Sequence, residues 1–112
     1  MNVEIALFEG FEELDAIGPY EVLALVGAHG GDLSISLRSL SGAGPVQASL
    51  GARIESEGTL GETDPDVVVV PGGGWNDRAD AGAWAEAERG DLPERLADLH
   101  AEGVTMASVC TG

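Results

Sequence analysis

The run Val67–Val70 constrains the fold most, because four consecutive β-branched residues show no alternation of apolar and polar side chains. Such a run is typical of a strand that is buried on both faces, as in a parallel sheet. The segment Asp-Pro-Asp at 64–66 precedes this strand, and the segment Pro-Gly-Gly-Gly at 71–74 ends it abruptly. A sheet buried on both faces needs helices on each side. We therefore expect an α/β fold.

The rest of the chain alternates between strand-like and helix-like segments. Strands are predicted at residues 3–8, 33–40 and 104–109, with a short hairpin at 46–50 and 52–55. Amphipathic or helical spacing predicts helices at about 14–26, 81–88 and 92–102. Pro19 is expected in the first turn of the first helix, and the glycine-containing segment 27–31 should end it. This order of elements predicts a single domain built as a three-layer sandwich around a parallel sheet.

The charge balance limits the partners that this chain can have. The formal net charge is −15, from 20 acidic residues against five arginines and no lysine. A surface of this kind repels phosphate backbones and anionic membranes, so we expect neither nucleic acid nor membrane as a partner. The spread of acidic residues along the chain favours adaptation to high salt over an ordinary acidic protein. No apolar run approaches the roughly 20 residues that span a bilayer, and no signal peptide is visible, so we expect a cytoplasmic protein.

Cys110 is the only cysteine, and it follows the last predicted strand in the sequence Ser-Val-Cys-Thr-Gly. This small-x-nucleophile-x-small pattern is typical of a sharp turn that holds a nucleophile in a strained backbone conformation, where only small neighbours avoid a clash. A helix after the turn would favour the thiolate form. The alternative is a buried, inert cysteine. The small neighbours Ser108, Thr111 and Gly112 favour the nucleophile.

Two further segments reach the same edge of the predicted sheet. The glycines of 71–74 follow the neighbouring strand, and their backbone N–H groups could approach a substrate anion, although Pro-Gly-Gly is also an ordinary turn. The turn after the first strand brings Glu12, Glu13 and Asp15 to this edge. A carboxylic acid beside a thiolate could donate a hydrogen bond to the sulfur and pass a proton to a substrate. For Glu12 and Glu13 a surface or helix-capping role is favoured, and for Asp15 the two readings stay open.

The remaining chemically versatile residues give no separate site. His29 and His100 lie near predicted helix ends, where an imidazolium suits the helix dipole. No spacing of histidine, cysteine and carboxylate indicates a metal, and the glycine turn lacks the Lys-Ser/Thr of a phosphate loop, so we expect no cofactor. Trp75 and Trp84 could line a pocket mouth or cover the sheet edge, and the sequence does not choose between these two positions.

Three segments together resemble the ThiJ/PfpI superfamily, within the class I glutamine amidotransferase-like fold. These are FEGFEELDAIGPYEVL at residues 8–23, VVVVPGGG at 67–74 and SVCTG at 108–112. The L-D-x-x-G-P core of the first segment is similar to isonitrile hydratases and to the amidase-like domain of AraC-type regulators. The resemblance covers residues 1–112, which look like the N-terminal portion of one such domain. It implies a flavodoxin-like parallel sandwich that is incomplete at the C-terminus.

The resemblance also implies roles for individual residues. By position, Cys110 would be the nucleophile and Asp15 the acid that addresses it. Gly73 and Gly74 would supply backbone amides to the substrate or oxyanion pocket, and Thr111 would lie beside the sulfur. The other two acidic residues of the first turn are not at matching positions.

The implied activity is that of a cofactor-independent, cysteine-dependent hydratase or hydrolase of a small molecule, similar to isonitrile hydratase. Deglycase, glyoxalase, amidase or protease chemistry of the same superfamily is the alternative, and a non-enzymatic redox-sensing or regulatory domain is another. The implied partners are the small-molecule substrate, the C-terminal half of the same domain (as a second chain or a missing segment) and a second copy in a homodimer.

Overall fold

The computed structural model describes all of residues 1–112 and contains a four-stranded parallel sheet in the order β2-β1-β5-β6. The strands are β1 (Asn2–Leu7), β2 (Ser34–Ser39), β5 (Val67–Val70) and β6 (Thr105–Ser108). Each neighbouring pair is parallel. The predicted α/β architecture is therefore confirmed, and the strand predicted from the run of four valines has the bounds that the sequence indicated.

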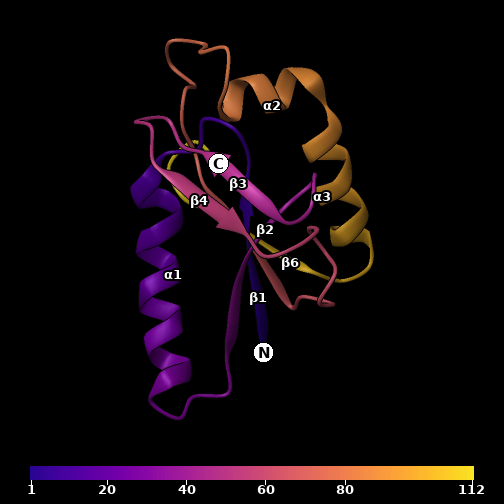
Figure 1. The fold of residues 1–112 in the computed structure, drawn as a ribbon. Coiled ribbons are helices and arrows are strands. Elements are labelled where there is room, and N and C mark those ends of the chain that lie inside the picture. The colour runs from indigo at the N-terminus through magenta and orange to yellow at the C-terminus, as the bar shows by residue number, and fades with distance from the viewer.

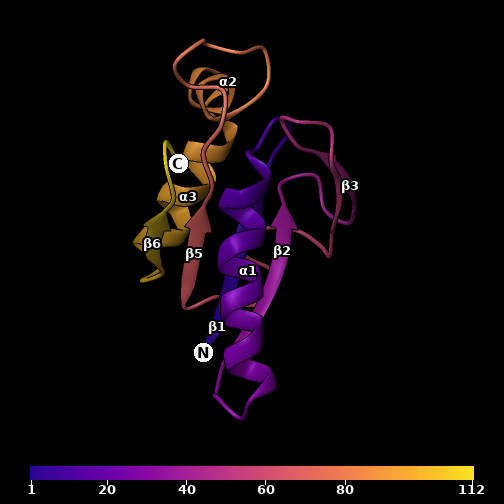
Figure 2. The same cartoon turned by 90° about the vertical axis from the view of Figure 1, so that its left-hand side faces the viewer.

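Helices lie on both sides of this sheet. Helix α1 (Glu13–Ala28) covers one side, whereas α2 (Ala83–Arg89) and α3 (Asp91–Ala101) lie on the other, as Figure 1 shows. A separate antiparallel hairpin of β3 (Gly44–Gln47) and β4 (Arg53–Ser56) lies beyond the β2 side of the sheet, and Figure 2 shows α1 in front of the strands. None of the three helices combines the length and apolar content that crossing a bilayer requires.

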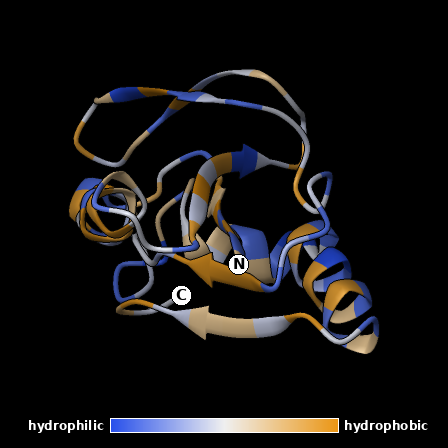
Figure 3. Cartoon of the chain, turned by 90° about the horizontal axis from the view of Figure 1, so that it is seen from below, coloured by the Kyte–Doolittle hydropathy of each residue, from blue (hydrophilic) through white to orange (hydrophobic).

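The apolar core lies where the central strands meet the helices. In Figure 3, hydrophobic colours are concentrated on strands in the middle of the molecule. Ile5, Leu7 and Val68 are fully or almost fully buried, and Phe11 and Leu99 join them from the segments that cover the sheet. Burial on both faces of β1 and β5 explains why these strands need no alternation of polar residues.

Helix α1 differs from the sequence-based expectation in two respects. Pro19 lies inside the helix rather than in its first turn, because the helix begins at Glu13. The helix is also not amphipathic in the expected sense, since its face toward the sheet is made by residues such as Ala16 and Leu23. Four other apolar residues of the helix are largely exposed, namely Leu14, Val22, Leu25 and Val26. Apolar residues thus lie on both sides of α1, and their spacing could not indicate which side faces the sheet.

Candidate active site

Cys110 lies in a tight turn directly after β6, and its side chain is exposed. Its backbone has a φ of 58°, a left-handed conformation that residues other than glycine rarely adopt. The turn is held by hydrogen bonds from the amide of Val109 to the carbonyl of Val70 and from the amide of Gly112 to the carbonyl of Val109. A side chain at Gly112 would collide with the carbonyl oxygen of Val70. The need for a small residue two positions after the nucleophile thus has a direct steric cause.

Two carboxylates lie beside this thiol. One oxygen each of Glu12 and Asp15 and the sulfur of Cys110 all lie within 4.8 Å of one another. The structure thus brings Asp15 to the cysteine, and it brings Glu12 there as well. Carboxylate and thiolate groups can also bind a metal ion, but exposed acidic groups often cluster without one. We therefore interpret the three residues as a nucleophile with two acidic neighbours.

Backbone hydrogen bonds fix the first turn of α1 against the glycine turn after β5. The amide of Glu12 donates to the carbonyl of Gly72 at 2.8 Å, and the amide of Gly72 donates to Oδ2 of Asp15 at 3.2 Å. Glu12 is the N-cap residue of α1, but its side chain makes no capping hydrogen bond. Of the surface and helix-capping roles expected for Glu12, its exposed side chain agrees with the first and not with the second. Its three-residue spacing from Asp15 at a helix start was the available signal that the two share a face.

The glycine turn provides backbone donors at the same place. The amide of Gly73 donates to Oγ1 of Thr111 at 3.2 Å, so this donor is already used within the chain. The amides of Gly74 and Thr111 donate no hydrogen bond to any other atom of the chain. Two unused donors beside a nucleophile are the arrangement that stabilises negative charge developing on a substrate atom. Of the two glycines named from the sequence, Gly74 is the one whose amide remains available.

A small cavity opens over the sulfur. It has a volume of about 230 Å³ and is lined by Glu12, Gly73, Gly74, Trp75, Asn76, Asp77, Cys110 and Thr111. Its size is below the usual range of pockets for drug-sized ligands, which begins near about 300 Å³. Such a cavity fits a small substrate.

Trp75 and Trp84 form an edge-to-face pair, with ring centroids 5.1 Å apart and planes at 80°. The guanidinium carbon of Arg78 lies 4.6 Å from the centroid of the Trp84 ring. Trp75 lines the cavity over Cys110, whereas Trp84 supports Trp75 from outside the cavity. Trp75 thus takes the pocket-lining position that the sequence left open, whereas Trp84 packs against Trp75 and Arg78.

Glu13 has a structural role outside the cluster. Its carboxylate accepts hydrogen bonds from the hydroxyl of Ser49 at 3.1 Å and from the amides of Leu50 and Ala52 at 2.9 and 3.3 Å. Partial burial by itself raises the pKa of Glu13, but these hydrogen bonds and one from its own backbone amide outweigh that effect and hold the pKa below the ordinary 4.5. Glu13 therefore attaches the tip of the β3–β4 hairpin to the start of α1.

Both histidines lie away from the cysteine. Nδ1 of His29, the residue after α1, is 2.8 Å from the carbonyl of Leu25. Nδ1 of His100, in the last turn of α3, is 3.4 Å from the carbonyl of Val104. These contacts agree with the structural role expected for each residue.

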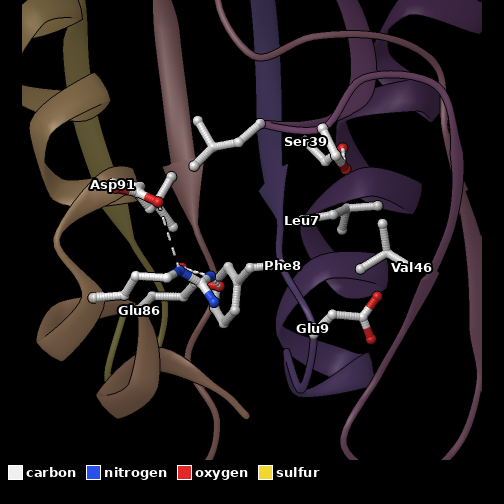
Figure 4. Close-up of a pocket in the computed structure, with 11 residues that line it drawn as sticks. Leu7, Phe8, Glu9, Ser39, Val46, Glu86 and Asp91 are labelled. Atoms are coloured by element: carbon white, nitrogen blue, oxygen red, sulfur yellow. Dashed lines mark hydrogen bonds and ion pairs between the residues drawn. The ribbon is translucent and has the colours of Figure 1, made fainter.

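A larger cavity of about 300 Å³ shares no lining residue with the cavity over Cys110. Figure 4 shows its lining, in which the buried carboxylate of Glu86 is paired with Arg89, and Arg89 also approaches Asp91 at 3.9 Å. Glu9 also lines it and accepts a hydrogen bond from the amide of Gln47 at 3.3 Å, and the cavity contains no cysteine. The smaller cavity is therefore the better candidate for an active site.

Comparison with known proteins identifies the family. The family model described as DJ-1/PfpI matches residues 1–112, which is the whole chain. The chain belongs to the DJ-1/PfpI family. A curated relative from Streptomyces lividans, an uncharacterized protein in the cpoL 5' region, is 31% identical over 112 residues, covering 99% of this chain and 74% of the relative.

Solved structures show the same DJ-1/PfpI fold. DJ-1beta of Drosophila melanogaster matches with a TM-score of 0.71 and 23% identity over 97% of this chain and 54% of that one. An AraC family transcriptional regulator from Pseudomonas putida matches with a TM-score of 0.73 and 22% identity over 96% and 54%. DJ-1 of Toxoplasma gondii, in an oxidized form, matches with a TM-score of 0.72 and 20% identity over 97% and 55%. The chain thus spans about half the length of these structures, and at these identities the likeness shows the fold alone.

Proposed function

We propose that this chain carries the nucleophile of a cofactor-independent, cysteine-dependent hydratase or hydrolase that acts on a small molecule. One observation carries the proposal: an exposed cysteine in a left-handed turn lies within 4.8 Å of two carboxylate oxygens. A strained, exposed nucleophile beside proton-carrying groups is typical of covalent catalysis.

In the proposed reaction, the thiolate of Cys110 attacks an electrophilic carbon of the substrate. The amides of Gly74 and Thr111 donate hydrogen bonds to the atom that gains negative charge. Asp15 takes the proton that the Cys110 thiol releases and passes it to the substrate. Water then attacks the covalent intermediate and restores the thiol.

Isonitriles are the substrate class we favour, because the L-D-x-x-G-P segment is similar to isonitrile hydratases. Addition of the thiolate to the terminal isonitrile carbon, with a proton from Asp15 to that carbon, gives a thioimidate. Water adds to the same carbon, the carbon–sulfur bond breaks, and an N-substituted formamide leaves. The net reaction adds one water and needs no oxidant or reductant.

Two substitutions in the complete protein test the proposal. Cys110→Ala should abolish isonitrile turnover, and Asp15→Asn should lower it by about 100-fold or more, the usual contribution of a positioned acid. Glu21→Gln is a control, because Glu21 is an exposed acid further along α1. Turnover near the wild-type rate in both site variants would rule the assignment out.

Reactive carbonyls or amides are the second substrate class, since the same thiol, donors and acid would serve a deglycase, glyoxalase, amidase or protease. A panel of methylglyoxal, a primary amide and an isonitrile separates these activities. Consumption of methylglyoxal without isonitrile turnover would favour reactive carbonyls over isonitriles as the substrate class.

A redox-sensing or regulatory role is the other candidate function. Exposure of Cys110 would let an oxidant reach the sulfur. Conversion of Cys110 to a stable sulfinate by peroxide, with no turnover of any substrate in the panel, would support this role over catalysis.

A homodimer of complete domains is also part of the proposal. The exposed apolar residues of α1, among them Leu14 and Val22, provide a candidate surface for it. Sedimentation of the complete protein should show a dimer, and Val22→Glu should shift it toward the monomer. A wild-type monomer at high concentration would exclude this part.

A further inference from the structure

Glu12 and Asp15 both lie near the sulfur, but only one of them faces the cavity. Glu12 lines the cavity over Cys110, whereas Asp15 is absent from that lining. Asp15 accepts the hydrogen bond from the amide of Gly72, so its carboxylate is partly committed to holding the glycine turn. The side chain of Glu12 is exposed and makes no hydrogen bond within the chain. Its carboxylate is therefore the one that a bound molecule would meet first.

The cavity contains no positive charge to compensate Glu12. Asp77 also lines it, so a second carboxylate lies at the same opening. The chain has no lysine, and none of its five arginines lines this cavity. Four of the arginines make contacts elsewhere: Arg38 with Glu62, Arg78 with Trp84, Arg89 with Glu86 and Arg95 with the carbonyl of Leu60. The carboxylates of Glu12 and Asp77 are thus the charged side chains that line the cavity with Cys110, and they would attract a positively charged group there.

We propose that Glu12 determines the charge specificity of the site and selects electrophiles that carry a positive charge next to the reacting atom. The inference rests on the proposed function in one respect, that Cys110 is a reactive nucleophile. It adds the class of substrate, a small cationic electrophile such as one bearing an ammonium group. It also gives the two acids different roles. Glu12 contacts the substrate, whereas Asp15 positions the glycine turn and transfers the proton beside the sulfur.

Three small thiol reagents that react by the same step can test this without knowledge of the natural substrate, if each rate is divided by the rate of the same reagent with free cysteine. They are the aminoethyl, methyl and sulfonatoethyl methanethiosulfonates, which are cationic, neutral and anionic. In each case the thiolate attacks the divalent sulfur of the reagent, a mixed disulfide forms, and methanesulfinate leaves with the electron pair of the broken bond. Because Cys110 is the only cysteine of the 112-residue chain, mass spectrometry reports its modification unambiguously.

The wild-type chain should react fastest with the cationic reagent and slowest with the anionic one. In Glu12→Gln the ratio of the cationic to the anionic rate should fall by about tenfold, as expected for one charge a few ångströms from the ligand in a partly hydrated site. The rate with the neutral reagent should change by less than about threefold, because a reagent without a net charge has little Coulomb interaction with the carboxylate that is removed.

Glu21→Gln is the matched control, since it removes the same charge from an exposed position two turns further along α1. At physiological ionic strength the screening length is about 8 Å, so this variant should change the rate ratio by less than about twofold. Asp77→Asn should lower the ratio, like Glu12→Gln. The side chains of Glu12 and Asp77 make no hydrogen bond within the chain. Glu12→Gln and Asp77→Asn should therefore unfold at the wild-type temperature.

The outcomes separate the two proposals. A rate ratio that is unchanged in Glu12→Gln, or that falls equally in Glu21→Gln, overturns the specificity role of Glu12 while Cys110 remains a reactive nucleophile. A wild-type thiol that reacts with the neutral reagent no faster than free cysteine overturns the proposed function, and the specificity inference with it.

Discussion

Gly72 and Thr111 lie so close together that a methyl group on Gly72 would stand 2.5 Å from the hydroxyl oxygen and 2.6 Å from the backbone nitrogen of Thr111. The glycine turn after β5 and the cysteine turn after β6 are therefore in direct contact. The position of each turn depends on the other, so a change in the glycine turn should displace the thiol of the cysteine turn.

Gly72→Ala should displace the cysteine turn. We expect a loss of about 1 to 3 kcal/mol in the free energy of unfolding, the usual cost of forcing an extra methyl group into a packed site. The rate of Cys110 modification by the neutral reagent should fall as well. Gly18→Ala in α1 is the control, because its nearest neighbour is a Leu14 side-chain carbon at 3.7 Å, and alanine should stabilise the helix by up to about 1 kcal/mol. Equal effects of the two variants would contradict the proposed contact.

Cys110→Gly should be more stable than Cys110→Ala. The left-handed backbone at Cys110 costs a residue with a side chain roughly 1 kcal/mol, and glycine avoids this cost. Urea unfolding of both variants measures the difference. Ser108→Gly and Ser108→Ala provide the control in the neighbouring strand β6, where glycine should be the less stable of the two because it loses more entropy. The same order at both positions would exclude strain in the turn.

The stability that Glu13 contributes should depend on pH. Because hydrogen bonds lower the pKa of Glu13 in the folded state, its contribution is fully present above the ordinary pKa of 4.5 and is lost as the pH falls through the folded pKa. The difference in urea midpoint between the wild type and Glu13→Gln should therefore be constant from about pH 7 down to about pH 5 and shrink below that. Glu21→Gln removes the same charge without these hydrogen bonds. A difference that persists unchanged in acid would refute the assignment.

Glu4 is a fully buried carboxylate in the central strand β1. It accepts hydrogen bonds from the amide of Gly61 at 2.6 Å, the amide of Thr63 at 3.1 Å and the hydroxyl of Thr63 at 2.7 Å. Glu4→Gln places an amide donor against these donors and should cost about 2 to 3 kcal/mol in unfolding free energy. Thr63→Val removes one hydrogen bond and should cost about 1 kcal/mol. If Glu4→Gln were the milder change, the carboxylate would not be holding the 61–63 loop.

Added salt should raise the melting temperature. The net charge of −15 makes the like charges of the folded chain repel one another. Salt also weakens attractive ion pairs, but the chain has only four of them. Raising the ionic strength from about 0.1 to about 1 M shortens the screening length from about 10 to about 3 Å and reduces this repulsion. Sodium and choline chloride should give similar increases if screening is the cause. A fall in melting temperature in both salts would be inconsistent with dominant self-repulsion.

Some features of the fold followed directly from local sequence. The valine run predicted β5 with its observed bounds, because β-branched residues followed by Pro71 and glycines specify a strand and its end within a few residues. The two helices after it were placed within about two residues, the usual error for helix ends. The start of α1 was predicted within one residue. Pro19 was misplaced, because the extended backbone at Glu12 starts the helix at Glu13 and leaves Pro19 beyond its first turn.

Some residues of the candidate site could likewise be predicted from local sequence, and others could not. Cys110 could be identified from its small neighbours, because the steric limits of its turn concern residues two positions away. Glu12 could not be assigned, because its use depends on which atoms of the distant glycine and cysteine turns lie next to it. The hydrogen bond from the amide of Gly73 to the hydroxyl oxygen of Thr111, which leaves Gly74 as the available donor, could not be predicted for the same reason.

The sequence alone determined the order of strands and helices and the turn that exposes the thiol, since these depend on steric and hydrogen-bonding preferences between residues a few positions apart. The tertiary structure decided which carboxylate faces the cavity and which one is committed to the backbone. Glu12 and Asp15 are separated from Cys110 by almost the whole chain, and only the parallel alignment of β1, β5 and β6 brings them to one edge.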